Sequence, residues 1–129
     1  MTLDFVDRLH EFVESLELDY PAHIGSLDTK ESIAIYPLPG GKIKQQFFDG
    51  TADRLLNYEF AIKSKKQRKA IATLDKLAEV LPDAEIVSAN GSYDFRGIEI
   101  SSEPFNSEMD EHYFYHALSV IAELTTYKQ

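Results

Sequence analysis

The sequence predicts an α+β fold in a single domain over residues 1–129. We expect a small, mostly antiparallel or mixed sheet of about five strands, packed against two amphipathic helices at about 4–18 and 65–81. Three observations lead to this prediction. Two segments carry apolar residues at helical period, the segments between them carry apolar residues at strand period, and 129 residues suit one domain. Apolar residues make up 43% of the chain, which is a globular composition.

The first helix is predicted from one apolar stripe near the start of the chain. Its members repeat at helical spacing and are Phe5, Leu9, Phe12, Val13 and Leu16. Thr2 or Asp4 can cap its start. Asp4 and Arg8 are spaced for an ion pair along the helix, and Pro21 prevents its continuation.

Three strands are expected in the next part of the chain. The segment "ESIAIYPLP" at 31–39 is apolar on both sides, as a strand with two covered faces would be. The cluster "PLPGG" at 37–41 favours a tight hairpin, because proline and glycine break regular structure. "KIKQQFFDG" at 42–50 and "LLNYEFAIKS" at 55–64 follow as two strands, with a turn around 49–51 between them.

The second helix is predicted to begin inside "KSKKQRK" at 63–69, which holds five positive charges. Ser64 and Gln67 have the spacing of a capping box, with Ser64 as the N-cap. The apolar stripe that follows consists of Ile71, Leu74, Leu77, Ala78 and Leu81. Pro82 closes the helix. Cations at a helix N-terminus cost roughly a few tenths of a kcal/mol each, because the helix dipole is positive there.

Periodicity alone leaves the last third of the chain open. Asn90-Gly91 is a strong hairpin-turn signal, and "FRGIEISSEPF" at 95–105 alternates as a strand that stops at Pro104. Residues 113–126 have one apolar face as a strand and another as a helix. We favour the strand, because the preceding strand would otherwise lack a neighbour.

Charge is unevenly distributed, although the whole chain has a net charge of −9. Residues 1–31 hold eight acids and two bases, residues 42–76 hold nine bases and four acids, and residues 79–129 hold ten acids and two bases. A basic middle between acidic ends does not suit a duplex-binding face, which usually belongs to a basic domain. It suits a subunit whose positive patch meets the negative patch of a neighbour.

No catalytic or metal-binding constellation stands out, so we expect no enzyme, no metal and no cofactor. The chain has no cysteine, which excludes disulfides and thiolate metal sites. His112 and His116 lie near acidic residues, but on a strand they would be about 13 Å apart. Surface or half-buried histidines are the preferred interpretation. The acidic, amphipathic start does not predict a secretory signal, and no apolar run is long enough to span a membrane.

The basic run has three interpretations: a solvated helix face, a contact with an acidic protein neighbour, or a nucleic-acid contact. Charge runs are most often solvated. Nucleic-acid binding would be favoured by interleaved aromatic residues, and residues 63–69 contain none. A small nucleic-acid-associated protein that uses this helix start remains the alternative function.

From about Ile33 to Phe105 the chain carries, in order, "IAIYPLPGG", an "FFDG" turn, "YEFAIKSKKQRKAIATLDKLAEVL", "NGSY" and "IEISSEPF". This order resembles the small minor capsid proteins of tailed phages and prophages, close in kind to tail terminators. The most specific parts are "YEFAIKSKKQRKAIATL" and "SSEPF". The density of lysine in the basic run departs from the mixed charge expected in such proteins.

The resemblance implies a structural, non-enzymatic protein with a small sheet packed against two helices. Such proteins form a homohexameric ring in the virion, at the head–tail junction, where the ring caps the tail tube and meets neck proteins. The chain would be made in the bacterial cytoplasm, and DNA would pass through the ring without specific binding. The candidate subunit-interface residues are Lys63, Lys65, Lys66, Arg68, Lys69, Pro39, Gly40, Gly41, Lys42, Glu103 and Phe105.

Overall fold

The computed structural model describes residues 3–27, 29–109 and 111–127. Its elements are, in chain order, α1 (Phe5–Ser15), β1 (Ala22–Ile24), β2 (Ser32–Gln46), β3 (Ala52–Ser64), α2 (Gln67–Val80), the 3-10 turn η1 (Leu81–Asp83), β4 (Tyr93–Met109) and β5 (Phe114–Thr126). One mixed sheet of five strands and two helices make up the described structure, so the predicted α+β fold is confirmed.

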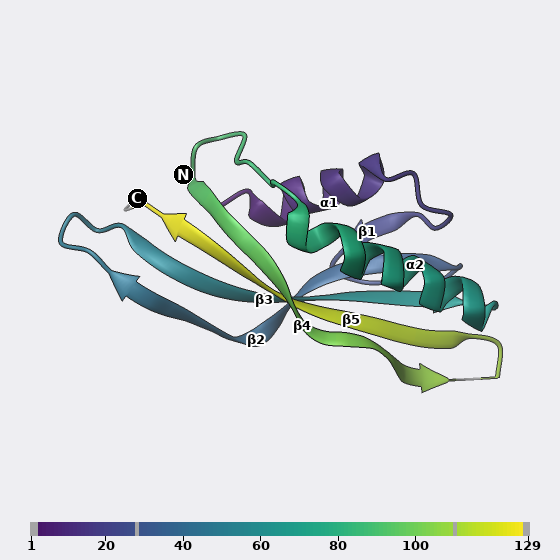
Figure 1. The fold of residues 1–129 in the computed structure, drawn as a ribbon. Helices are drawn as coiled ribbons and strands as arrows, with labels where there is room; N and C mark the ends of the chain where they lie inside the picture. Colours follow the sequence, from purple (N-terminus) through teal and green to yellow (C-terminus); the bar gives the residue numbers. More distant parts are fainter. Residues whose placement is uncertain (1–2, 28, 110, 128–129) are drawn as a thin grey trace.

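The strands are ordered β1-β2-β3-β5-β4. β1 runs parallel to β2, and the other neighbouring strands are antiparallel. Both helices lie on the same side of the sheet, and β2 and β3 continue beyond them as a projecting hairpin (Figure 1). The sheet therefore has one covered face, one open face and a hairpin that leaves the body of the molecule.

The predicted hairpin at 37–41 is wrong, because residues 31–39 and 42–50 do not form separate strands. β2 runs through the cluster with a register shift between Leu38 and Lys42, and Gly40 takes a positive φ of 102° there. β1 pairs with β2 only up to Ile35, so Pro37 and Pro39 lie on an edge without a neighbouring strand among the described residues. Proline is tolerated there, since no partner strand needs its missing N–H.

The sequence analysis also expected five strands, but it counted residues 31–39 and 42–50 as two strands and did not predict β1. In the structure those two segments contribute to the single strand β2, and β1 is the fifth strand. The hairpin turn predicted around residues 49–51 is confirmed and joins β2 to β3. The amide of Phe47 donates to the carbonyl oxygen of Thr51, and the carboxylate of Asp49 accepts from the amide and hydroxyl of Thr51.

Both helices are shorter than predicted. α1 ends at Ser15 rather than 18, and Glu17 then takes a positive φ of 52°. The predicted Asp4–Arg8 ion pair is replaced by an Arg8–Glu11 pair. α2 begins at Gln67, with Lys66 at the N-cap, so the capping box on Ser64 is wrong. Ser64 is instead the last residue of β3.

Residues 113–126 form a strand, as preferred: β5 spans Phe114–Thr126 and pairs with both β3 and β4.

Two other predictions for the last third of the chain are wrong. Asn90-Gly91 lies in the irregular segment before β4 and joins no two strands. β4 continues through Pro104 to Met109, with a register shift between Ser102 and Phe105, because Pro104 also lies on an edge strand.

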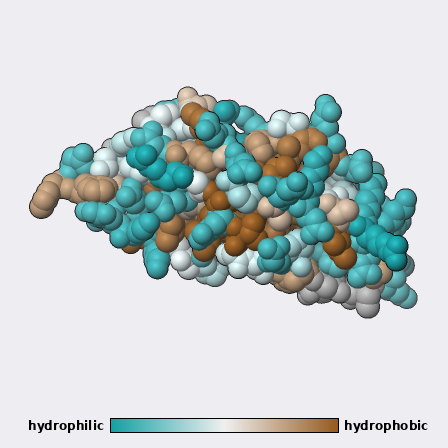
Figure 2. Space-filling view, in the orientation of Figure 1, coloured by the Kyte–Doolittle hydropathy of each residue, from teal (hydrophilic) through white to brown (hydrophobic). Residues whose placement is uncertain are grey.

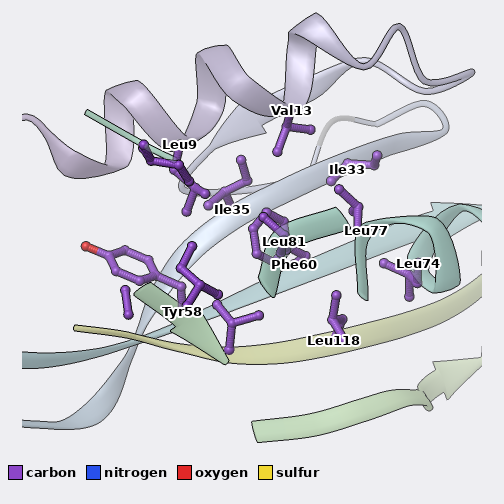
Figure 3. Close-up of a cluster of buried hydrophobic side chains, with 14 of the residues drawn as sticks. Leu9, Val13, Ile33, Ile35, Tyr58, Phe60, Leu74, Leu77, Leu81 and Leu118 are labelled. Carbon is purple, nitrogen blue, oxygen red and sulfur yellow. The ribbon is translucent and has the colours of Figure 1, made fainter. Parts of the chain in front are cut away.

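The core lies between the helices and the covered face of the sheet (Figure 3). Leu9 and Val13 of α1 and Leu74 and Leu77 of α2 point toward the strands and are buried. The side chains that meet them from the sheet include Ile33, Ile35, Phe60, Leu118 and Val120. The Phe5 ring packs on Tyr58 and Tyr93, with ring centroids 5.4 and 5.5 Å apart. This packing holds α1 against both β3 and β4.

Candidate subunit-contact surfaces

The basic run divides between three elements. Lys63 is the last residue but one of β3, Lys65 and Lys66 lie in the link between β3 and α2, and Arg68 and Lys69 belong to the first turn of α2. The Nζ of Lys63 donates to the carbonyl oxygen of Thr29 and lies 4.3 Å from the centroid of the Tyr113 ring. The Nζ of Lys65 lies 5.7 Å from the same centroid.

Lys69 is also held by its own chain. Its Nζ lies 3.8 Å from the Oδ2 of Asp19 and 5.3 Å from the centroid of the Tyr20 ring. Lys66 and Arg68 are exposed, and neither side chain has a partner in the part of the chain that the structure describes. Two of the five bases are therefore available to another molecule without breaking a contact within the chain.

A hydrogen-bond network fixes the start of this basic helix. The buried hydroxyl of Ser64 lies 2.6 Å from the hydroxyl of Tyr20 and donates to the Oε2 of Glu31 at 2.9 Å. It also accepts from the amide of Lys66 at 3.0 Å. The amide of Lys65 and the Ser64 hydroxyl both donate to Glu31 and hold its pKa below the ordinary value. These hydrogen bonds therefore hold the backbone between β3 and α2, which carries the basic run, in one position.

The other predicted contact residues lie on two opposite edges of the sheet. Pro39, Gly40, Gly41 and Lys42 are exposed on β2, beyond the end of β1. Glu103 and Phe105 are exposed on β4, the strand at the far edge. Phe105 pairs with Ala117, which in turn pairs with Ala61, so this edge lies near the end of the sheet that carries the basic run.

The open face of the sheet is partly apolar and partly charged. Lys44 and Glu123 form a 3.2 Å ion pair there, beside a hollow of about 410 Å³ to which Leu55 and Ile121 contribute. The hydroxyl of Tyr36 donates to Glu59, and burial raises the pKa of that carboxyl. This face therefore combines apolar and charged side chains, as a protein contact can do.

The sequence prediction did not include the exposed hairpin tip among the candidate contact residues. We call residues 41–51 the arm. Every residue from 41 to 49 is exposed, the side chain of Phe48 is fully exposed, and those of Phe47 and Ile43 are 42% and 54% exposed. The arm tip projects at the far left of Figure 2 and is hydrophobic there. The sequence does contain one indication of this exposed apolar tip, the adjacent residues Phe47 and Phe48. Successive side chains of a strand point to opposite faces, so a sheet with one covered face can bury at most one of the two.

The sequence prediction also missed a groove beside β4. We call it the β4 groove; it is lined by residues 82–85, Val87 and residues 93–97, and it encloses about 580 Å³. Val87, on its wall, is 60% exposed. The loop that carries Val87 is held in place, because Arg8 donates through Nε to the Val87 carbonyl oxygen at 2.8 Å.

The histidines do not come together as metal ligands. His116 lies on the covered face of β5 and is 2% exposed, so the expectation of a surface or half-buried histidine is wrong for this residue. Within residues 3–27, 29–109 and 111–127, no group of three or more histidine, aspartate or glutamate side chains is placed to hold a metal ion. None of the helices described is long and apolar enough to cross a membrane.

Comparison with known protein families gives a match for this chain. The family model described as "Bacteriophage tail terminator protein" matches residues 12–124, which is most of the chain. No curated protein matches the sequence significantly. The matched range includes β1 to β4, both sheet edges, the arm, the basic run and most of β5.

Proposed function

Since the chain belongs to the bacteriophage tail terminator family, we propose that it acts at the head–tail junction of the virion as a homohexameric ring. In this proposal the ring caps the tail tube, meets neck proteins above it and lets DNA pass without binding it specifically. The protein works by assembly and docking, not by catalysis. It would be made in the bacterial cytoplasm before it joins the particle.

The family match carries this proposal, and the surfaces on opposite edges of the sheet support it. Contacts between two different surfaces of identical subunits are head-to-tail, and they close into a ring when the rotation between subunits allows it. One edge carries Pro39 to Lys42, and the other carries Glu103 and Phe105. A single copy can therefore contact two neighbours at once.

Charge also supports contacts between copies. Lys66 and Arg68 are exposed at one end of the molecule. Exposed acids lie on another part of the surface, on α1, and include Asp7, Glu11 and Glu14. Complementary patches of this kind steer association and set its register, although they add less to affinity than buried apolar contacts do.

Nucleic-acid binding through the basic run is the alternative. It would use Lys63, Lys65 and Lys69, but these side chains already contact Thr29, Tyr113, Tyr20 or Asp19 within the chain. Only Lys66 and Arg68 would then be free to neutralise phosphates. Two phosphate contacts give a shallow salt dependence and weak binding.

Native mass measured over a concentration series, at low and moderate salt, with and without purified tail tubes, tests the proposal. We expect a discrete hexamer that persists in moderate salt, either in solution or on the tubes, because an apolar contact is little affected by salt. A chain that stays monomeric at every concentration and does not bind tubes would contradict the proposal. Binding to duplex DNA that weakens with salt, in such a monomer, would favour the alternative.

A further inference from the structure

We propose that the arm of one copy of this chain docks into the β4 groove of the next copy, with Phe48 and Phe47 as its anchors. This inference rests on the ring assembly proposed above, because it names the two surfaces that would join neighbouring subunits. It differs from the contacts expected from the sequence, which involve the basic run and the edge segments at 39–42 and 103–105.

The arm has the properties of an inserting element. Phe48 is fully exposed and Ile43 is more than half exposed, and such apolar side chains gain about 1.5–3 kcal/mol each when they leave water. The turn is already ordered: Phe47 and Thr51 share a backbone hydrogen bond of 2.9 Å, and Asp49 accepts from Thr51. An ordered tip loses little conformational entropy on binding.

The β4 groove has the properties of a receiving surface. Pro82, Ala84, Val87 and Phe95 supply apolar walls, and about 580 Å³ is within the range of pockets that hold a bulky group. The loop at its wall is fixed, because the hydroxyl of Tyr93 donates to the Ile86 carbonyl oxygen. A preformed groove keeps the cost of binding low.

Charge favours a second copy of this chain as the occupant of the groove. Three exposed acids line the groove, Asp83, Glu85 and Asp94, against one exposed base, Arg96, so its lining has a net negative charge. The arm carries two bases, Lys42 and Lys44, and one acid, Asp49, so its net charge is positive. Lys42 is exposed behind the aromatic tip, whereas Lys44 already pairs with Glu123 of its own chain. Apolar groups would thus meet in the centre, with opposite charges around them, which is the usual arrangement of a specific protein contact.

The positions of the two surfaces fit a head-to-tail contact. The arm extends from β2 and β3, whereas the groove adjoins β4, and β5 lies between β3 and β4 in the sheet. One copy can therefore insert its arm into one neighbour and accept the arm of another. Repetition of this contact gives a closed ring or an open filament, according to the rotation between copies.

Engineered cysteines test the contact directly, because the natural chain has no cysteine. We would mix Phe48→Cys protein with Val87→Cys protein, oxidise the mixture, and separate the products under denaturing, non-reducing conditions. A disulfide between the two variants is expected, and the double variant should give a covalent ladder that ends at six chains. Ile24→Cys, at an exposed apolar position on β1, replaces Val87→Cys as the matched control and should give no such product with Phe48→Cys.

A second measurement keeps the test independent of cysteine geometry. Phe48→Ala should raise the concentration needed for half-assembly at least tenfold, which corresponds to about 1.4 kcal/mol. Ile24→Ala should leave this concentration unchanged. Phe48 is fully exposed in the single chain, so folding is expected to be normal in the variant, and thermal unfolding would verify this.

The outcomes separate this inference from the proposed function. A wild-type hexamer with no cross-linked product, and with normal assembly of Phe48→Ala, would overturn the arm contact and leave the ring proposal standing. A Phe48→Ala ring that forms normally but no longer binds tail tubes would also overturn it, and would assign the arm to the tube. A wild-type chain that forms no ring, even on tubes, would overturn both.

Discussion

The Oδ1 atom of Asp4 accepts a 2.7 Å hydrogen bond from the hydroxyl of Ser88, which lies 84 residues further along the chain. The same carboxylate accepts from the hydroxyl of Ser92 and from the backbone amides of Ala89 and Asn90. Burial raises the pKa of Asp4, but these hydrogen bonds outweigh burial and hold it below the ordinary value. The start of α1 is thereby tied to the loop before β4, beside the β4 groove.

We predict that Asp4→Asn lowers the free energy of unfolding at pH 7 by about 1–3 kcal/mol, since it leaves donors of this loop without an anionic acceptor. Because the pKa of Asp4 is lowered in the folded state, its contribution is present above the unfolded-state pKa of about 3.9. The contribution is lost as the pH falls below that value, through the folded-state pKa. Urea denaturation at several pH values between 7 and 3 measures it.

The matched control is Asp75→Asn, at an exposed position in the middle of α2. It should change stability by less than about 0.5 kcal/mol. An equal cost of Asp4→Asn at pH 7 and at pH 3 would show that the effect does not come from the ionised carboxylate.

Asp4 also shows where sequence reasoning reaches its limit. Its place just before an apolar stripe correctly predicts the start of α1. Its partners could not be predicted, because they come from a loop distant in sequence. The same holds for the basic run. Its position at the start of a helix can be predicted from the sequence, but the contacts of Lys69 with Asp19 and of Lys63 with Tyr113 depend on the tertiary fold.

Strand edges account for two errors in the predicted fold, the hairpin at 37–41 and the strand end at Pro104. Pro37, Pro39 and Pro104 each suggest the end of a strand, and each lies within a strand at the edge of the sheet. Whether a strand lies at the edge is decided by the whole sheet, not by the local sequence. By contrast, β5 was correctly preferred as a strand, because the strand before it needed a neighbour; its alternate residues from His116 to Leu124 are buried on the covered face, a pattern that periodicity alone did not distinguish from a helix.

We predict that Ser64→Ala lowers the free energy of unfolding by about 1–3 kcal/mol, because it leaves the buried hydroxyl of Tyr20 and the amide of Lys66 without their partner. Tyr20→Phe removes the same hydrogen bond from the other side. The double variant should therefore be less destabilised than the sum of the two, with a coupling of about 0.5–3 kcal/mol in chemical denaturation.

Ser26→Ala is the control for this cycle, since Ser26 is exposed. It should be neutral within about 0.5 kcal/mol. Strict additivity of Ser64→Ala and Tyr20→Phe would mean that the 2.6 Å contact between these hydroxyls contributes nothing to stability.

Reversal of the exposed charges in the basic run should block ring formation if that run contacts an acidic neighbour. Changing Lys65, Lys66 and Lys69 together to glutamate would also disturb the contacts that Lys65 and Lys69 make with Tyr113 and Asp19. The double variant Lys66→Glu, Arg68→Glu avoids this difficulty, because both residues are exposed and neither side chain has a partner among the described residues.

For the double variant we expect no loss in the free energy of unfolding, because acids at a helix N-terminus are favoured by the helix dipole, and at least a tenfold rise in the concentration needed for assembly. This increase in the concentration needed for assembly should be smaller at high salt, because salt screens the repulsion between the new glutamates and an acidic neighbour. Lys76→Glu, an exposed reversal on the same helix, serves as the control and should assemble normally. Native mass over a concentration series measures both variants. If the double variant assembles as the wild type does, the exposed part of the basic run is a solvated helix face and makes no subunit contact.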